Sequence, residues 1–154
     1  ETAGDRIGRI TPEGEVEAVK TLYAGSSPYR ITGAPDGALW FTESANGRIG
    51  RITPQGDLAE FPLPDSGCVP EGIAPGPDGA LWFCEVAGDR IGRITAAEGV
   101  REYPLPTAGA LPRRITAGPD GALWFTEEGS GRIGRLVLVD TLSLYLPLAM
   151  KGAR

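Results

Sequence analysis

Pro77-Asp78-Gly79-Ala80-Leu81-Trp82-Phe83 is the middle copy of a heptapeptide that occurs three times, with the other copies starting at Pro35 and Pro119. Neighbouring copies are 42 residues apart. A second phrase, Arg-Ile-Gly-Arg, has the same spacing and starts at Arg6, Arg48, Arg90 and Arg132. Self-similarity at a fixed period of this length indicates an array of one supersecondary unit. The repeat therefore decides the fold.

Each repeat predicts four short antiparallel strands. In the middle copy, residues 71–76 enter the Pro-Asp-Gly turn, which is a tight hairpin signal because proline presets φ and glycine accepts the left-handed conformation. Residues 80–86 follow as an aromatic and apolar strand, 90–95 as a third strand, and 100–105 alternate with a two-residue period. Four strands per 42 residues, without helical periodicity, predict an all-β fold in which each repeat is one blade of a β-propeller.

The blade frame leaves the propeller ring incomplete. Residues 1–24 supply the outer half of a blade, and complete blades follow at 25–66, 67–108 and 109–150, with 151–154 as a tail. Propellers close with about four to eight blades, so three and a half leave the ring open. We expect either that the chain is the carboxy-terminal part of a longer polypeptide or that several copies complete a ring. In both cases other blades are the required partners.

Residues that recur in every repeat have an architectural explanation. We expect the tryptophan to pack between neighbouring blades, and the glycine inside the third strand to mark a close approach between sheets. We expect the glutamate that ends the second strand to pair with the first arginine of Arg-Ile-Gly-Arg. These positions are Trp40, Trp82 and Trp124; Gly50, Gly92 and Gly134; Glu43, Glu85 and Glu127, with Glu1 as a fourth; and Arg48, Arg90 and Arg132.

The three internal glutamates also have a second interpretation. Carboxylates that converge near a channel are ligands for a hard cation such as Mg²⁺, which prefers oxygen and keeps several waters. Glu43, Glu85 and Glu127 are therefore the candidate metal ligands of the chain.

Composition narrows the function classes. The chain has 15 lysines and arginines against 20 acidic residues, a net charge of −5, whereas a nucleic-acid surface would show clustered positive charge. It has no histidine, the commonest general base at neutral pH, so no catalytic residue is assigned. Cys68 is expected to stay unbridged because hairpin counting places Cys84 beside Gly72. Both a secreted and a cytoplasmic location remain open.

The carboxy-terminal segment departs from the repeat. At the repeat spacing Tyr145 falls on Phe61 and Tyr103, which predicts that the outer strand of the last blade is kept. The segment is too short and too interrupted for a membrane span, which needs about 20 consecutive apolar residues. No membrane span is expected.

Ligand-binding residues are sought among positions that break the repeat, because one binding site does not need three copies. The loop that enters each inner strand is such a place, where the equivalent dipeptides at 29–30, 71–72 and 113–114 all differ. We expect them to ring one mouth of the channel and to contact a small molecule or peptide; the alternative is that they are solvated loop residues. The candidates are Tyr29, Arg30, Glu71, Arg113 and Arg114.

The phrase Ile-Ala-Pro-Gly-Pro-Asp-Gly-Ala-Leu-Trp-Phe-Cys-Glu at 73–85, followed by Gly-Asp-Arg-Ile-Gly-Arg-Ile-Thr at 88–95, strongly resembles the streptogramin B (virginiamycin B) lyase family. The resemblance extends to about residue 136. It implies a seven-bladed propeller with the same blade length. It also implies a carbon–oxygen lyase of antibiotic resistance that linearises cyclic depsipeptides by Mg²⁺-dependent elimination at the ester bond.

Only part of the family's set of functional residues is present in this chain. The resemblance implies a metal-holding glutamate at Glu43, Glu85 or Glu127, a catalytic histidine fourteen residues before it, and a second acidic ligand two residues earlier still. The histidine positions carry Tyr29, Glu71 and Arg113, and the acidic positions carry Ser27, Val69 and Leu111. One hypothesis is a ligand-binding or structural module without the catalytic histidine. The alternative is a Mg²⁺-dependent lyase whose histidines are supplied by blades outside this sequence.

Overall fold

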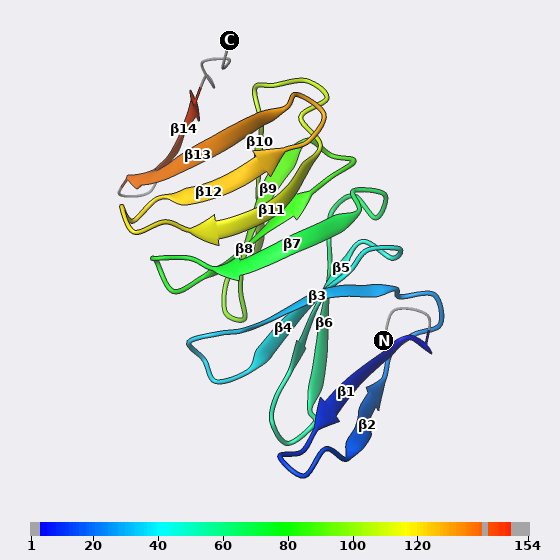
Figure 1. Cartoon of the computed structure of the whole chain (residues 1–154). Helices are drawn as coiled ribbons and strands as arrows, with labels where there is room; N and C mark the ends of the chain where they lie inside the picture. Colours follow the sequence, from blue (N-terminus) through cyan, green and yellow to red (C-terminus); the bar gives the residue numbers. More distant parts are fainter. Residues whose placement is uncertain (1–3, 140–141, 149–154) are drawn as a thin grey trace.

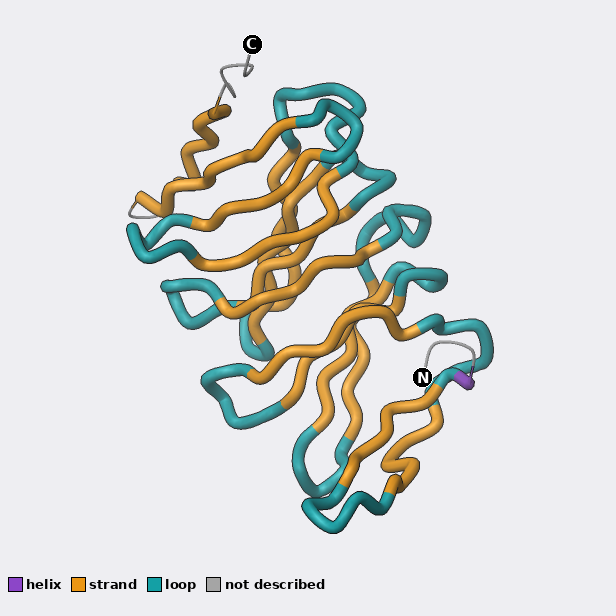
Figure 2. Tube along the Cα trace, viewed as in Figure 1, coloured by secondary structure: helices purple, strands orange, loops and turns teal. Residues whose placement is uncertain are grey.

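The computed structural model describes residues 4–139 and 142–148, so Glu1 and the predicted tail at 151–154 lie outside it. The predicted all-β class is confirmed, and among the described residues no helix is long and apolar enough to cross a membrane (Figure 2). The strands are β1 (Arg6–Ile10), β2 (Val16–Thr21), β3 (Pro28–Gly33), β4 (Leu39–Glu43), β5 (Arg48–Ile52), β6 (Leu58–Pro62), β7 (Pro70–Pro75), β8 (Leu81–Glu85), β9 (Arg90–Thr95), β10 (Gly99–Pro104), β11 (Pro112–Ala117), β12 (Leu123–Glu127), β13 (Arg132–Val139) and β14 (Leu142–Leu148).

The strands form an open row of antiparallel sheets. Three sheets have four strands each, β3 to β6, β7 to β10 and β11 to β14, while β1 and β2 form a two-stranded sheet. Within every sheet the spatial order follows the chain order. Among the first strands of the three large sheets, β7 contacts both β3 and β11, and the later strands extend away from them (Figure 1). The predicted partial propeller with an unclosed ring is confirmed.

One aspartate ties together the turn and two strands of each blade. In the middle blade Asp78 Oδ1 accepts hydrogen bonds from Trp82 Nε1 (2.9 Å) and the Ala80 amide (3.3 Å), and Oδ2 accepts one from Arg93 Nε (2.8 Å). Partial burial opposes ionisation, but the bonds from Trp82 and Arg93 hold the pKa of Asp78 below its usual value. The same contacts recur around Asp36 and Asp120.

The repeated tryptophan packs between blades, as predicted. Trp40 is fully buried and stacks on Phe61 of β6 with ring centroids 5.4 Å apart. Its cluster includes Ile73 and Phe83 of the next blade. Trp82 has the same position one blade further on, whereas Trp124, on the last described blade, is half-buried.

The glycine of the third strand makes room for a ring of its own sheet. Gly92 faces Phe83 across the β8–β9 pair, and a Cβ on Gly92 would lie 2.1 Å from Phe83 Cζ. The predicted approach between sheets is therefore wrong, because the crowding comes from the neighbouring strand of the same blade. Gly50 with Phe41 and Gly134 with Phe125 repeat this contact.

The last blade keeps its outer strand but changes the register. Ile133 faces Leu148, whereas the equivalent Ile49 of the first complete blade faces Phe61. Tyr145 therefore does not take the place of Phe61, although β14 is present as predicted. The reason lies in β13, which has 8 residues against 5 in β5, because the Thr-Pro turn that ends β5 is replaced by a continuous apolar run.

The two cysteines are separate and buried. Cys68 and Cys84 are both free thiols with no exposed surface, in agreement with the expected absence of a bridge. Burial, and next the negative charge of Glu85, raises the pKa of Cys68 to about 12. Burial also raises the pKa of Cys84, so both thiols stay protonated at neutral pH.

Replacement of Gly92 by alanine tests the ring-over-glycine contact. We expect Gly92→Ala to lower the free energy of unfolding by about 1–3 kcal/mol, because the new methyl group must displace a buried ring. Gly33→Ala is the matched control, since Gly33 is also a strand residue and its Cβ would meet nothing within 4 Å. Chemical denaturation measures both variants, and equal stability of the two would contradict the assignment.

Candidate functional site

Each inner strand carries a bulge at the predicted site. The register of β11 with β12 shifts between Pro112 and Ile115, so Arg113 and Arg114 together lie opposite Thr126. A bulge of two residues against one re-aims the side chains of its strand. The same shift affects 29–30 in β3 and 71–72 in β7. The positions that break the sequence repeat are therefore the positions that the bulges displace.

In two blades the loop that enters the inner strand is held by an aspartate of the preceding blade, Asp5 before β3 and Asp89 before β11, whereas Gly47 stands at this position before β7. Asp89 accepts hydrogen bonds from the amides of Gly109 (2.7 Å) and Leu111 (2.9 Å). Leu111 has a φ of 47°, a left-handed conformation that non-glycine residues rarely adopt, and its carbonyl accepts a bond from the Glu128 amide (3.2 Å). Ser27 and Val69 have the same conformation at the equivalent positions. The bulges thus start from a fixed backbone.

Glu71 joins the second and third inner strands. Its carboxylate is buried and accepts hydrogen bonds from Arg113 Nη1 at 3.0 Å (Oε1) and 3.3 Å (Oε2). Arg114 Nη1 lies 3.5 Å from Oε2 of the same carboxylate. One acidic group therefore holds two guanidinium groups of the next blade, and such charge-assisted bonds are stronger than neutral ones.

Tyr29 extends this contact to the first inner strand. Arg114 Nη2 donates a hydrogen bond to Tyr29 Oη (3.4 Å), and the Arg114 guanidinium carbon is 5.6 Å from the ring centroid. The guanidinium carbon of Arg30 is 5.3 Å from the same centroid. All five predicted residues therefore lie in one contiguous group on β3, β7 and β11, which we call the inner-strand cluster: Tyr29, Arg30, Glu71, Arg113 and Arg114.

Sequence reasoning missed one member of this surface. Glu128, directly after β12, forms an ion pair with Arg113 Nε. The equivalent positions carry Ser44 and Val86, so Glu128 also breaks the repeat. The criterion that selected the inner-strand cluster would have selected Glu128 if it had been applied to the end of the second strand.

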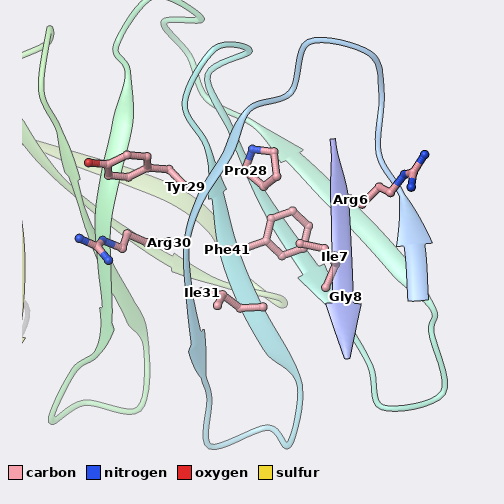
Figure 3. Close-up of a pocket in the computed structure, with 8 residues that line it drawn as sticks. All are labelled: Arg6, Ile7, Gly8, Pro28, Tyr29, Arg30, Ile31 and Phe41. Carbon is pink, nitrogen blue, oxygen red and sulfur yellow. The ribbon is translucent and has the colours of Figure 1, made fainter. Parts of the chain in front are cut away.

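A cavity of about 150 Å³ separates β1 from β3 and β4. Figure 3 shows that Tyr29 and Arg30 project from β3 on the side away from β1, while Phe41 lies on the side of β1. By the repeat, β1 is a third strand, and within residues 4–139 and 142–148 no second strand pairs with its two-stranded sheet. The cavity lies where a second strand packs in the complete blades, and Tyr29 and Arg30 line it although their side chains project away from β1. Its lining residues are Arg6, Ile7, Gly8, Pro28, Tyr29, Arg30, Ile31 and Phe41.

The recurring arginine pairs only in part as predicted. Arg48 Nη1 donates to Glu60 of the outer strand β6 (3.1 Å), not to the predicted Glu43. In the middle blade Arg90 Nη1 is 3.5 Å from Glu85, as predicted, and 3.7 Å from Glu102. In both blades the outer strand brings a second carboxylate to the arginine, Glu60 on β6 and Glu102 on β10.

Two of the recurring glutamates therefore belong to buried acid pairs. Glu43 has no exposed surface, and neither of its carboxylate oxygens has a hydrogen-bond partner among the described residues. Burial, and next the charge of Glu60, raises the pKa of Glu43 to about 7. Burial and the charge of Glu102 raise the pKa of Glu85 to about 7 as well. Each pair is poorly suited to carry two negative charges.

The acid pairs do not assemble a metal site by themselves. Within the described residues no three histidine, cysteine, aspartate or glutamate side chains lie close enough to hold a metal ion together. Glu43 and Glu60 offer two carboxylates, but the Arg48 guanidinium already occupies this site beside Glu60. No metal-dependent step follows from these residues. The assignment of Mg²⁺ to Glu43, Glu85 and Glu127 stays a prediction.

Comparison with known proteins places the chain in a family. The family model described as the virginiamycin B lyase family matches residues 1–154. This chain belongs to the virginiamycin B lyase family. The crystal structure of selenomethionine-substituted virginiamycin B lyase from Staphylococcus aureus is 46% identical over 98% of this chain, with a TM-score of 0.88. A catalytically inactive variant of that lyase with quinupristin has the same identity, coverage and TM-score.

The likeness covers only part of these relatives. The chain spans about half of their length, 51% for the virginiamycin B lyase structure. A putative 6-phosphogluconolactonase from Bacteroides uniformis shares the fold at 15% identity and a TM-score of 0.69, over 92% of this chain and 49% of that one. No curated protein matches the chain.

The pH dependence of stability tests the buried acid pair. The pKa of Glu43 rises from its ordinary 4.5 to about 7 on folding, so the folded state favours the protonated carboxyl group. The stability that this protonation contributes is fully present below pH 4.5 and is lost as the pH rises through about 7. We expect Glu43→Gln to match the native protein near pH 4. Near pH 8 we expect it to be more stable by about 1–3 kcal/mol.

Urea denaturation at the two pH values measures this difference. Glu13→Gln, in an exposed turn, is the control and should show no pH-dependent gain. A stability difference between Glu43→Gln and the native protein that is the same at both pH values would refute the proposed burial of an acid pair.

Proposed function

We propose that this chain is a ligand-binding module, and that a small molecule or peptide contacts the inner-strand cluster at the mouth of the propeller channel. The observation that supports the proposal is the convergence of the repeat-breaking residues. Glu71 holds Arg113 at 3.0 Å, and Arg114 reaches Tyr29, 85 residues away in the sequence, at 3.4 Å. The turn aspartate, the tryptophan and the third-strand glycine are identical between blades, whereas these residues differ and lie together.

Binding without turnover agrees with the absence of histidine. The positions where the family's catalytic histidine would stand carry Tyr29, Glu71 and Arg113, and all three belong to the inner-strand cluster. The catalytically inactive virginiamycin B lyase from Staphylococcus aureus was crystallised with quinupristin, so a propeller of this family can hold a ligand without turnover. We extend this behaviour to the present chain.

A Mg²⁺-dependent lyase is the second candidate function. Membership of the family and 46% identity to virginiamycin B lyase favour it. In this case the histidines must come from blades outside the chain, and an upstream blade with Pro-His-Gly-Ile before its Pro-Asp-Gly turn would distinguish this candidate. Within the present sequence, elimination at an ester has no histidine to serve as its base.

Alanine substitution in the cluster tests the binding function. We expect quinupristin or members of a set of short linear peptides to bind, and Arg113→Ala/Arg114→Ala to raise the dissociation constant at least tenfold by removing two guanidinium groups from the site. Titration followed by nuclear magnetic resonance measures the change. Arg101→Ala is the control, because Arg101 is exposed on the outer strand β10. A folded protein that binds none of these ligands, or binds them equally after the double substitution, contradicts the proposal.

The lyase candidate is tested with the same ligand. The native chain is incubated with quinupristin and Mg²⁺, and the products are separated by liquid chromatography with mass detection. Elimination opens the ring without changing the mass, whereas hydrolysis adds one water. We expect only the cyclic compound to be recovered. A ring-opened product of unchanged mass, lost when Mg²⁺ is chelated, would establish the lyase instead.

A further inference from the structure

Arg30 is a cation without an acidic partner. Its guanidinium lies over the ring of Tyr29, and no carboxylate of the described residues forms an ion pair with it. Its side chain is exposed, and its backbone amide donates a hydrogen bond to Thr42 Oγ1 (3.1 Å). The turn aspartates, by contrast, each bind an arginine of their own blade. In a chain with a net charge of −5, an arginine left unpaired in the candidate site requires an explanation.

The neighbouring charges leave one positive charge in excess. Arg113 contacts both Glu71 and Glu128, and Arg114 contacts Glu71. Three guanidinium groups therefore face two carboxylates, and the unmatched cation is Arg30. One excess positive charge suits a ligand with a single negative charge, because Glu71 and Glu128 would repel a second negative charge on the ligand.

The unmatched cation and a second guanidinium both contact the ring of Tyr29. The guanidinium carbons of Arg30 and Arg114 lie 5.3 Å and 5.6 Å from the centroid of its ring. The phenol oxygen lies 3.4 Å from Arg114 Nη2 and supplies a hydroxyl at the same place. Guanidinium groups match the two oxygens of a carboxylate in a planar, bidentate geometry. Two guanidinium groups and a hydroxyl that share one ring are the kinds of donor that bind a carboxylate.

We propose that the inner-strand cluster recognises an organic monocarboxylate, namely the terminal carboxylate of a linear peptide, with Arg30 and Arg114 as its ligands and Tyr29 as the surface between them. This inference rests on the proposed binding function and specifies its ligand. An ester carries no charge, so a cyclic ester would leave Arg30 unpaired, whereas a linear acid pairs it. The site therefore favours ring-opened or linear acids over cyclic esters.

A matched pair of peptides tests the inference on the complete chain. An N-acetylated tripeptide with a free terminal carboxylate and the same peptide as its terminal amide are titrated by calorimetry at low ionic strength. We expect the acid to bind at least tenfold more tightly than the amide. Arg30→Ala should reduce the affinity for the acid to that for the amide and leave the amide unchanged, and Arg30→Lys should restore part of the difference. Arg101→Ala should have no effect.

The outcomes separate this inference from the proposed function. Equal binding of acid and amide to the native protein, lost together in Arg113→Ala/Arg114→Ala, would overturn carboxylate recognition and leave a binding site in place. An equal loss of affinity for the acid and the amide in Arg30→Ala would also overturn it, because Arg30 would then support the structure of the site and not bind the carboxylate. If neither peptide binds while other ligands of the test set do, the carboxylate assignment fails and the binding function stands.

Discussion

The register of the inner hairpin is the constraint on which each blade depends. At the turn, the aspartate fixes the hairpin by accepting bonds from the following tryptophan and from the arginine of the third strand. At the other end, Pro70 faces Glu85, while Ile73 faces Phe83. Two residues must then lie opposite one, so a bulge is built into every inner strand. Both ends of the inner hairpin have the same residue pairs in every blade, so the bulged dipeptide between them can differ without changing the register. This difference permits one distinct binding site on a fold built from similar repeats.

The sequence predicted the architecture closely because one repeat contains all of its determinants. Turn residues, strand alternation and the period together specify the four strands, and departures from the repeat identified the cluster. The contacts within the cluster were beyond prediction, since Glu71 and Arg113 lie one full repeat apart and their distance depends on how two blades pack. The error at Gly92 has a similar origin, because the residue facing it follows from register, not from composition.

The buried acid pairs were missed for a related reason. Glu60 and Glu102 recur at the repeat spacing, but their approach to Glu43 and Glu85 runs across the third strand of the blade. A buried glutamate beside a second glutamate lowers stability at neutral pH, because burial and the neighbouring charge raise its pKa. Family membership identifies the fold of this chain, and a fold can persist while the catalytic groups on it change. In this chain the positions of the family's histidine carry members of a charged and aromatic cluster.

A crystal structure of the chain with a linear peptide acid tests the account most directly, because it locates the ligand and its charged end together. The account predicts a peptide at the inner-strand cluster, with both oxygens of its terminal carboxylate within hydrogen-bond distance of Arg30 and Arg114 and close to the Tyr29 hydroxyl. A peptide bound elsewhere on the molecule, or one whose carboxylate points to solvent while the cluster keeps its internal contacts unchanged, would contradict it.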